Sequence, residues 1–207
     1  MNYQHFNWGP FIMKTSCPKR VLKRLDADGR QAKTNWNHEL AGHLKNQYRY
    51  PEVFDQWFYT EMSEVFTGYR QAHCVYHGFE YIPLQLVYQD LWVNFMQAGD
   101  FNPPHIHSGD ISFVIFVDVP KKLETEMKEH EGTTAKPGQL IFNYGENSKL
   151  RQWASIGHFI TPKTGDMYIF PAQQQHWVAP YKTDVTRISV SGNLKYIYPD
   201  KLPKGYF

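Results

Sequence analysis

The sequence predicts a mainly β domain that is supported by N-terminal helices. From residue 81 onward, short segments rich in β-branched and aromatic residues follow one another, separated by Gly, Pro and Asn, as in an all-β sandwich or barrel. Before residue 80, apolar residues recur at three- and four-residue spacing, which is typical of helices. We therefore expect a single domain over residues 1–207, with helical support in 1–80 and the β core in 81–200.

Three helices are expected in the N-terminal part. Ser16 and Pro18 can start the first helix, and Gly29 can end it. A second helix is expected to begin near Trp36, and a third after Pro51. The third helix has an apolar face that consists of Phe54, Trp57, Phe58, Val65, Phe66 and Tyr69.

The strands of the β core are expected in the segments 81–96, 111–119, 138–144, 158–162, 166–171, 176–180 and 186–194. The segment 120–138 is charged and poor in apolar residues, so we expect an exposed loop or a lid there. The helices are expected to pack against the sheet, because no linker divides the chain.

Composition excludes several classes of protein. Lys and Arg (22) nearly balance Asp and Glu (20), so there is no strong signal for nucleic-acid binding. The two cysteines are too few for a disulfide framework and favour the cytoplasm. We find neither a secretory signal nor an apolar run long enough for a membrane helix, so no membrane partner is expected.

Two histidine pairs in the N-terminal part are interpreted as structural. HELAGH (38–43) is similar to the zinc-protease motif HExxH, but His38 and His43 are five residues apart. On a regular helix they would diverge by roughly 140°, too far to share one ion. His73 and His77 have the four-residue spacing but no acidic residue between them.

Three other histidines form a candidate metal site. His105 and His107 lie on one face if the backbone is extended, and the prolines before them favour extension. His176 follows a later strand. Neutral imidazole is the commonest protein metal ligand. A lone histidine beside an apolar strand is usually structural, but three at strand ends favour a metal site.

An arginine accompanies these histidines. Arg187 and Ser189 share one face of the last strand, and the guanidinium can grip a carboxylate in a bidentate pair. The alternative is an edge arginine that pairs with Asp184 or Glu146.

The segments HIHSGDISFVIFVDVP and KTGDMYIFPAQQQHWVAPYKTDVTRISVSGNL resemble the iron(II)/2-oxoglutarate-dependent dioxygenases. The resemblance covers residues ~80–195 and is greatest to the oxygenases of T4-like marine cyanophages, which are related to prolyl hydroxylases. FNWGPFIMKT and HELAGHLKNQY are also similar to that phage group. The resemblance implies a double-stranded β-helix, which is a jelly roll similar to the cupins, with helices packed on its major sheet.

The resemblance also implies an activity. Such an enzyme uses Fe(II), the co-substrate 2-oxoglutarate and O2 to hydroxylate a substrate, here unidentified, with a peptidyl prolyl residue as the candidate by analogy. His176 would be the distal metal ligand, and Arg187 and Ser189 would bind the far carboxylate of 2-oxoglutarate. Asn94 would hydrogen-bond the co-substrate. No catalytic residue is expected beyond the metal site, and a phage origin would place the enzyme in the host cytoplasm.

One position departs from the family pattern. The usual motif is H-x-D or H-x-E, but position 107 is His. Either His105, His107 and His176 all bind the metal, or Asp110 folds back as a substitute ligand beside His107. We favour the three histidines, with Asp110 as their outer partner or as the alternative ligand.

Two further interpretations are open. A cupin-type metal protein, acting as an isomerase, a binding module or a dioxygenase without 2-oxoglutarate, would also have histidines on a jelly roll, but it would leave Arg187 and Ser189 unexplained. A non-enzymatic phage protein with a vestigial site would not take up iron.

Overall fold

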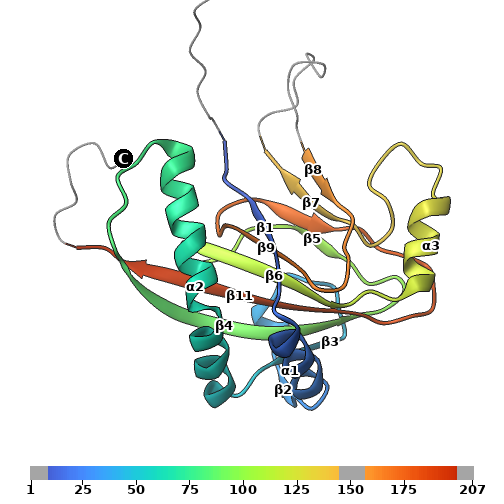
Figure 1. The fold of residues 1–207 in the computed structure, drawn as a ribbon. Helices are drawn as coiled ribbons and strands as arrows, with labels where there is room; N and C mark the ends of the chain where they lie inside the picture. The colour runs from blue at the N-terminus through green and yellow to red at the C-terminus, as the bar shows by residue number, and fades with distance from the viewer. Residues whose placement is uncertain (1–8, 145–156, 200–207) are drawn as a thin grey trace, which may run out of the picture.

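The computed structural model describes residues 9–144 and 157–199, which form two antiparallel sheets and the helices that cover them (Figure 1). The elements in chain order are β1 (Met13–Ser16), α1 (Lys19–Gly29), β2 (Thr34–Asn35), η1 (Asn37–Glu39), β3 (Asn46–Arg49), α2 (Glu52–His77), β4 (Gln85–Met96), β5 (Asn102–His105), β6 (Ile111–Asp118), α3 (Lys121–Glu129), β7 (Leu140–Asn143), β8 (Gly157–Ile160), β9 (Asp166–Pro171), β10 (His176–Val178) and β11 (Arg187–Ile197).

The two sheets form a jelly roll. The larger has seven strands in the order β1-β9-β6-β11-β4-β3-β2, and the smaller has four in the order β5-β10-β7-β8. Consecutive strands such as β5 and β6 lie in different sheets, so the chain winds between them. This architecture confirms the predicted fold class.

Helices α1 and α2 cover the outer face of the larger sheet (Figure 1). The Phe113 ring of β6 packs against Phe58 and Phe66 of α2, with ring centroids 5.6 and 5.4 Å apart. The helix ends at Gly78, whose φ of 72° is the left-handed conformation that glycine adopts without strain. The predicted supporting role of the first and third helices is therefore confirmed. No helix in the described ranges is long and apolar enough to cross a membrane.

The strand β11 alternates between two environments. Ile188 and Val190 belong to the core beneath the helices, whereas Arg187, Ser189 and Ser191 line a pocket between the sheets. This alternation follows from the two-residue period of a strand. The predicted division of the last strand into a polar and an apolar face is confirmed.

The segment 120–138 is not a loop throughout, as the sequence had led us to expect. It contains α3, whose Leu123 and Met127 are buried in the core between the sheets. Two apolar residues four positions apart are enough to anchor one face of a short helix, although its other positions are charged.

A second correction concerns the helix expected near Trp36. Only the single turn η1 forms there, and the chain continues into β3. The Asn37 side chain explains this: it donates to the carbonyl oxygens of Leu44 and Lys45 and accepts from the Gln47 backbone N–H. These bonds favour a turn and an extended strand over a helix. The support region 1–80 therefore also contributes β1, β2 and β3 to the larger sheet.

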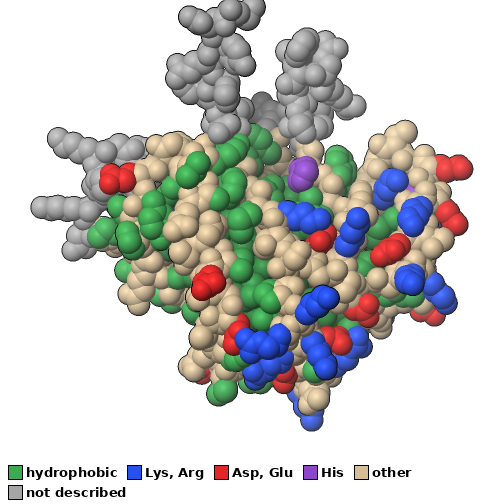
Figure 2. Space-filling view, in the orientation of Figure 1, with side chains coloured by type: hydrophobic (Ala, Val, Ile, Leu, Met, Phe, Trp, Pro, Cys, Tyr) green, Lys and Arg blue, Asp and Glu red, His purple; other side chains and the backbone are tan. Residues whose placement is uncertain are grey.

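Surface charge is mixed where the space-filling view shows it. Basic and acidic side chains lie side by side over α1 (Figure 2), where Arg24 pairs with Asp28 and Arg30 with Asp26. This mixture agrees with the near balance of charges in the sequence.

Candidate metal centre

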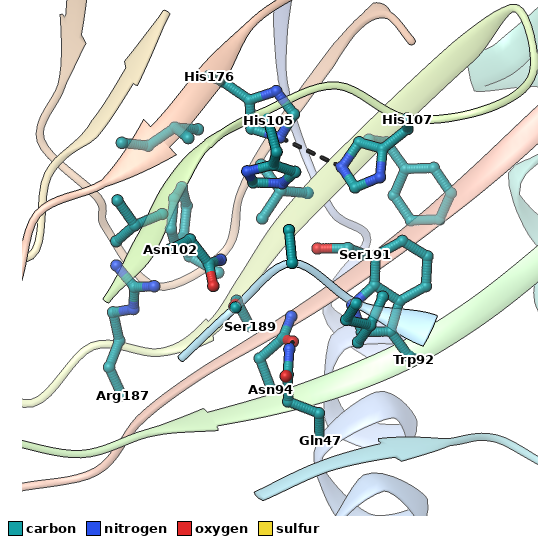
Figure 3. A pocket seen from close by; sticks show the side chains of 18 of the residues that line it. Gln47, Trp92, Asn94, Asn102, His105, His107, His176, Arg187, Ser189 and Ser191 are labelled. Atoms are coloured by element: carbon teal, nitrogen blue, oxygen red, sulfur yellow. Dashed lines mark hydrogen bonds between the residues drawn. The ribbon is translucent and has the colours of Figure 1, made fainter. Parts of the chain in front are cut away.

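A pocket opens between the two sheets, and residues from both sheets line it (Figure 3). Three histidines stand at one end, Arg187 stands at the other, and polar side chains of the larger sheet form the floor between them. The pocket therefore brings together most of the residues that the sequence singled out.

His105 and His176 face each other across a strand pair. His105 ends β5, His176 begins β10, and the two are direct antiparallel partners with ring centroids 4.3 Å apart. The Nδ1 atom of His105 lies 2.7 Å from the carbonyl oxygen of Pro103, and that of His176 lies 2.9 Å from the carbonyl oxygen of Gln174. A proton on each Nδ1 satisfies these bonds and leaves both Nε2 lone pairs free for a metal.

His107 completes the cluster from the loop after β5. Its backbone N–H donates to the Ala172 carbonyl oxygen at 2.9 Å, and its own carbonyl oxygen accepts from Gln173 Nε2 at 3.0 Å. These bonds anchor the loop beside the start of β10. The Nε2 atom of His107 lies 3.2 Å from Nε2 of His176 (Figure 3).

The environment keeps the three rings uncharged. Burial and the neighbouring histidines lower the pKa of His107 to about 2, and burial followed by His105 lowers the pKa of His176 to about 4. Burial also lowers the pKa of His105. Neutral imidazole is the form that binds a metal.

The donor set fits a transition metal. One ligand atom from each of the three histidines lies within 4.8 Å of the other two, so small ring rotations bring all three onto one ion. A set of three nitrogen donors suits iron, zinc, copper and nickel, whereas calcium and magnesium prefer oxygen. Three ligands also leave open positions for other molecules.

Arg187 is buried without an anionic partner. Its side chain is 2% exposed, Nη1 donates to the Gly138 carbonyl oxygen at 2.8 Å, and Nε has no partner. Among the described residues no carboxylate forms an ion pair with it, Asp184 included. Glu146, the other partner considered, lies outside the described residues. Burial lowers the pKa of Arg187 to about 10, so the side chain remains a cation that needs an anion.

The floor between Arg187 and the histidines consists of two rows of side chains across β4 and β11. Ser189 is paired with Asn94 in one row, and Ser191 with Trp92 in the next. The Trp92 ring lies 5.7 Å from that of His107, so the second row is the one beside the histidines. Asn94 and Ser189 therefore lie midway along the pocket, as Figure 3 shows.

Asp110 is the one predicted site residue that the structure does not bring to the pocket. Its Oδ2 atom accepts from the Tyr196 backbone N–H at 2.7 Å, and Oδ1 from the Tyr198 hydroxyl at 3.4 Å. Gly109, with φ 90°, turns the chain away from the histidines before β6 begins. The carboxylate instead holds the start of β6 against the end of β11.

The histidine pairs of the N-terminal part lie outside this cluster. His38 is exposed beside Glu39, and His43 stacks on Phe101. His73 and His77 pack their rings 4.5 Å apart near the end of α2 and do not belong to the group formed by His105, His107 and His176.

Several pocket residues were not predicted. Gln47 of β3, Asn102 of β5 and the segment 40–42 all line the pocket. HELAGH therefore contributes to the site through Leu40, Ala41 and Gly42, which carry no signal for chemistry in the sequence. β3 is too short for its two-residue period to reveal Gln47.

Comparison with protein families gives one match. The family described as "Putative 2OG-Fe(II) oxygenase" matches residues 90–193, which include all three histidines and Arg187. No curated protein sequence matches the chain.

Solved structures share the fold at low identity. A prolyl 4-hydroxylase of Pseudomonas putida has a TM-score of 0.53 and 14% identity, over 87% of this chain and 90% of its own. The viral collagen prolyl hydroxylase of Paramecium bursaria Chlorella virus 1, solved with 2OG, has a TM-score of 0.52 and 14% identity, over 90% of this chain and 96% of its own. HygX of Streptomyces hygroscopicus, solved with nickel, 2-oxoglutarate and hygromycin B, has a TM-score of 0.55 and 7% identity, over 91% of this chain and 83% of its own.

Proposed function

This chain belongs to the 2OG-Fe(II) oxygenase family, whose members are oxidoreductases, and from that premise we propose that it hydroxylates a C–H bond with His105, His107 and His176 as its iron ligands. The observation that carries the proposal is that one pocket holds both a potential metal-ligand group and an unpaired cation. Three neutral imidazoles lie at one end, and a buried arginine without an anion lies at the other.

Arg187 is proposed to bind the far carboxylate of 2-oxoglutarate. Its unpaired Nε and the Ser189 hydroxyl on the same face of β11 are donors, as a carboxylate requires. The charge of the guanidinium is little screened in a buried pocket, which strengthens its attraction for the dianion. Asn94, paired with Ser189 across the strands, is proposed to add an amide donor.

The chemistry is divided between cofactor and protein. Iron(II), O2 and 2-oxoglutarate together supply an oxygen atom for the C–H bond, while 2-oxoglutarate becomes succinate and carbon dioxide. The histidines hold the metal, Arg187 and Ser189 orient the co-substrate, and the apolar walls formed by Phe116, Leu140 and Phe170 exclude water.

The experiment that tests this proposal is an anaerobic titration of metal-free protein with Fe(II) and then 2-oxoglutarate, followed by the visible charge-transfer band of the chelate. Arg187→Ala should need at least about tenfold more 2-oxoglutarate, since a charged hydrogen bond contributes about 1.5–3 kcal/mol. Lys195→Ala is the matched control, because Lys195 is an exposed cation on the same strand.

Two results would contradict the proposal. Iron uptake without a band would favour the cupin interpretation, and the absence of iron uptake would favour a vestigial site. His105→Ala, His107→Ala and His176→Ala should each weaken Fe(II) binding, whereas His38→Ala, at an exposed site, should not.

We propose a peptidyl prolyl residue as the substrate. The support is similarity of fold to prolyl hydroxylases, including one solved with a hypoxia-inducible-factor peptide fragment, from Trichoplax adhaerens. Incubation with proline-rich peptides should add one oxygen atom to a proline, detected by mass spectrometry, in a reaction that needs 2-oxoglutarate. Succinate release coupled to oxidation of another compound, with no peptide modified, would reject this substrate. A close relationship to the cyanophage oxygenases stays a prediction.

A further inference from the structure

Gln47 extends the middle of the pocket floor onto a third strand. In the registers of β6, β11, β4 and β3, Phe116 is paired with Ser189, Ser189 with Asn94, and Asn94 with Gln47. All four residues line the pocket. Gln47 is therefore the outermost member of a continuous row, and Asn94 is its neighbour in that row.

The two amides in this row are directly bonded. Nε2 of Gln47 donates to Oδ1 of Asn94 at 2.7 Å, and the two residues are 2% and 5% exposed. Oε1 of Gln47 is buried without a partner. Because Oδ1 of Asn94 is occupied by this bond, its Nδ2 group is the end that faces the pocket, as Figure 3 shows.

The orientations of the two amides are coupled. If Gln47 donates, Asn94 presents N–H donors to the pocket; if Gln47 accepts, Asn94 presents its oxygen. A dicarboxylate with a keto group offers only acceptors, so the second orientation places oxygen against oxygen. In the first orientation Oε1 of Gln47 is buried without a partner, and in the second the Gln47 amide nitrogen takes the same place.

We propose that Gln47 is a positioning residue, which holds the Asn94 amide so that its N–H group meets 2-oxoglutarate. This inference rests on the proposed function. Asn94 shares its row with Ser189, which is two residues from Arg187 along β11. The next row contains Trp92, which lies beside His107. The Asn94 donor therefore faces the middle of the pocket, between Arg187 and the histidines. Gln47 lies before residues 90–193, which match the family model, so the proposal assigns a role in co-substrate affinity to a segment outside that range.

The test compares Gln47→Glu and Gln47→Met in the anaerobic titration. An ionised glutamate accepts only, so Asn94 must donate to it and turn Oδ1 toward the co-substrate, and the added charge also repels the dianion. The dissociation constant for 2-oxoglutarate should rise at least about tenfold. Methionine has similar length and no donor, so Asn94 is left free to rotate, and a smaller rise is expected. Fe(II) affinity without co-substrate should stay within about twofold of the parent for Gln47→Met.

Two controls separate positioning from a structural role. Gln85→Glu makes the same change at an exposed site on β4 and should leave 2-oxoglutarate binding unchanged. In an Asn94→Ala background, Gln47→Met should have no further effect, because Gln47 acts only through Asn94.

The outcomes are distinguishable. A parent protein without a 2-oxoglutarate band rejects the proposed function, and this inference with it. A parent band with unchanged 2-oxoglutarate affinity in Gln47→Met rejects the inference alone, even if Gln47→Glu fails to fold. An equal loss in the parent and in the Asn94→Ala background also rejects it, since Gln47 would then act independently of Asn94.

Discussion

At the scale of single residues, position 107 departs from the H-x-D or H-x-E motif that the sequence resemblance implied. An imidazole stands where a carboxylate is usual, and the cluster consists of three neutral donors. A divalent ion held by this set keeps both its positive charges, so a dianionic co-substrate has a stronger attraction to it than to a site with one carboxylate. Arg187, at the other end of the pocket, adds a third positive charge.

His107→Asp tests this argument. The variant should still bind Fe(II) but should bind 2-oxoglutarate about three- to tenfold more weakly, because the added carboxylate offsets one charge of the ion. Anaerobic titration gives both affinities. His38→Asp is the control, because it adds the same charge at an exposed position and should leave 2-oxoglutarate binding unchanged. Tighter binding of 2-oxoglutarate by His107→Asp would show that charge does not govern the affinity.

At the scale of elements, the pocket depends on a segment with no regular structure. Residues 40–42 close it, and Gly42 fits so tightly that a Cβ atom there would lie 2.1 Å from Oδ1 of Asn102 and 2.9 Å from Cδ1 of Leu44. The segment is held by the bridge between His43 and Phe101. A side chain at position 42 must therefore displace Asn102, a residue of the pocket.

Gly42→Ala should weaken 2-oxoglutarate binding several-fold because the pocket wall shifts. Its effect on the free energy of unfolding should remain within about 1–2 kcal/mol, since only the ends of two side chains, Asn102 and Leu44, must move. Gly68→Ala is the matched control: a Cβ atom there meets nothing within 4 Å, so α2 should be stabilised by about 0.5–1 kcal/mol with binding unchanged. Co-substrate titration and urea unfolding measure the two effects. Unchanged 2-oxoglutarate affinity in Gly42→Ala would mean that this wall does not limit binding.

At the scale of the whole molecule, the larger sheet has a core on each face. One core lies beneath α1 and α2, and the other lies between the sheets and includes α3. Because the same strands contribute to both, we propose that the chain unfolds as one cooperative unit.

Asp55 is a buried carboxyl group on α2, the helix that covers the first of these cores. It is 8% exposed, its Oδ1 atom has no partner, and the Arg49 side chain is 4.0 Å away.

Stability should therefore depend on pH through Asp55. Burial raises the pKa of Asp55 from 3.8 to about 7, against the opposing effect of Arg49. Between these values Asp55 in the folded protein retains a proton that the unfolded chain releases, so the contribution of Asp55 to the free energy of unfolding should fall as the pH rises from about 4 to 7. Buried histidines such as His107 and His176, whose pKa values are lowered, contribute with the opposite sign, so Asp55 is assessed by comparison with Asp55→Asn. Asp55→Asn should stabilise the protein by about 1–3 kcal/mol at pH 8 and have a smaller effect at pH 5. Urea unfolding at both pH values measures this difference, and an equal effect at both would contradict the assignment.

The sequence by itself determined the residue period of most helices and strands, and it identified the histidines and the arginine of the candidate site. The two-residue period of β11 places Arg187 and Ser189 on one face, and the spacing of apolar residues after Pro51 predicts α2, because these signals arise within one segment. The histidines were identified in the same way, from their positions near strand ends.

Only the tertiary structure decided which distant residues meet. Gln47 enters the pocket because β3 pairs with β4, and Gly42 because its segment packs on Asn102. Asp110 lies away from the histidine cluster because the backbone of β11 offers its carboxylate a hydrogen bond. Each of these outcomes depends on partners far away in the chain, and local residue patterns carry no information about such partners.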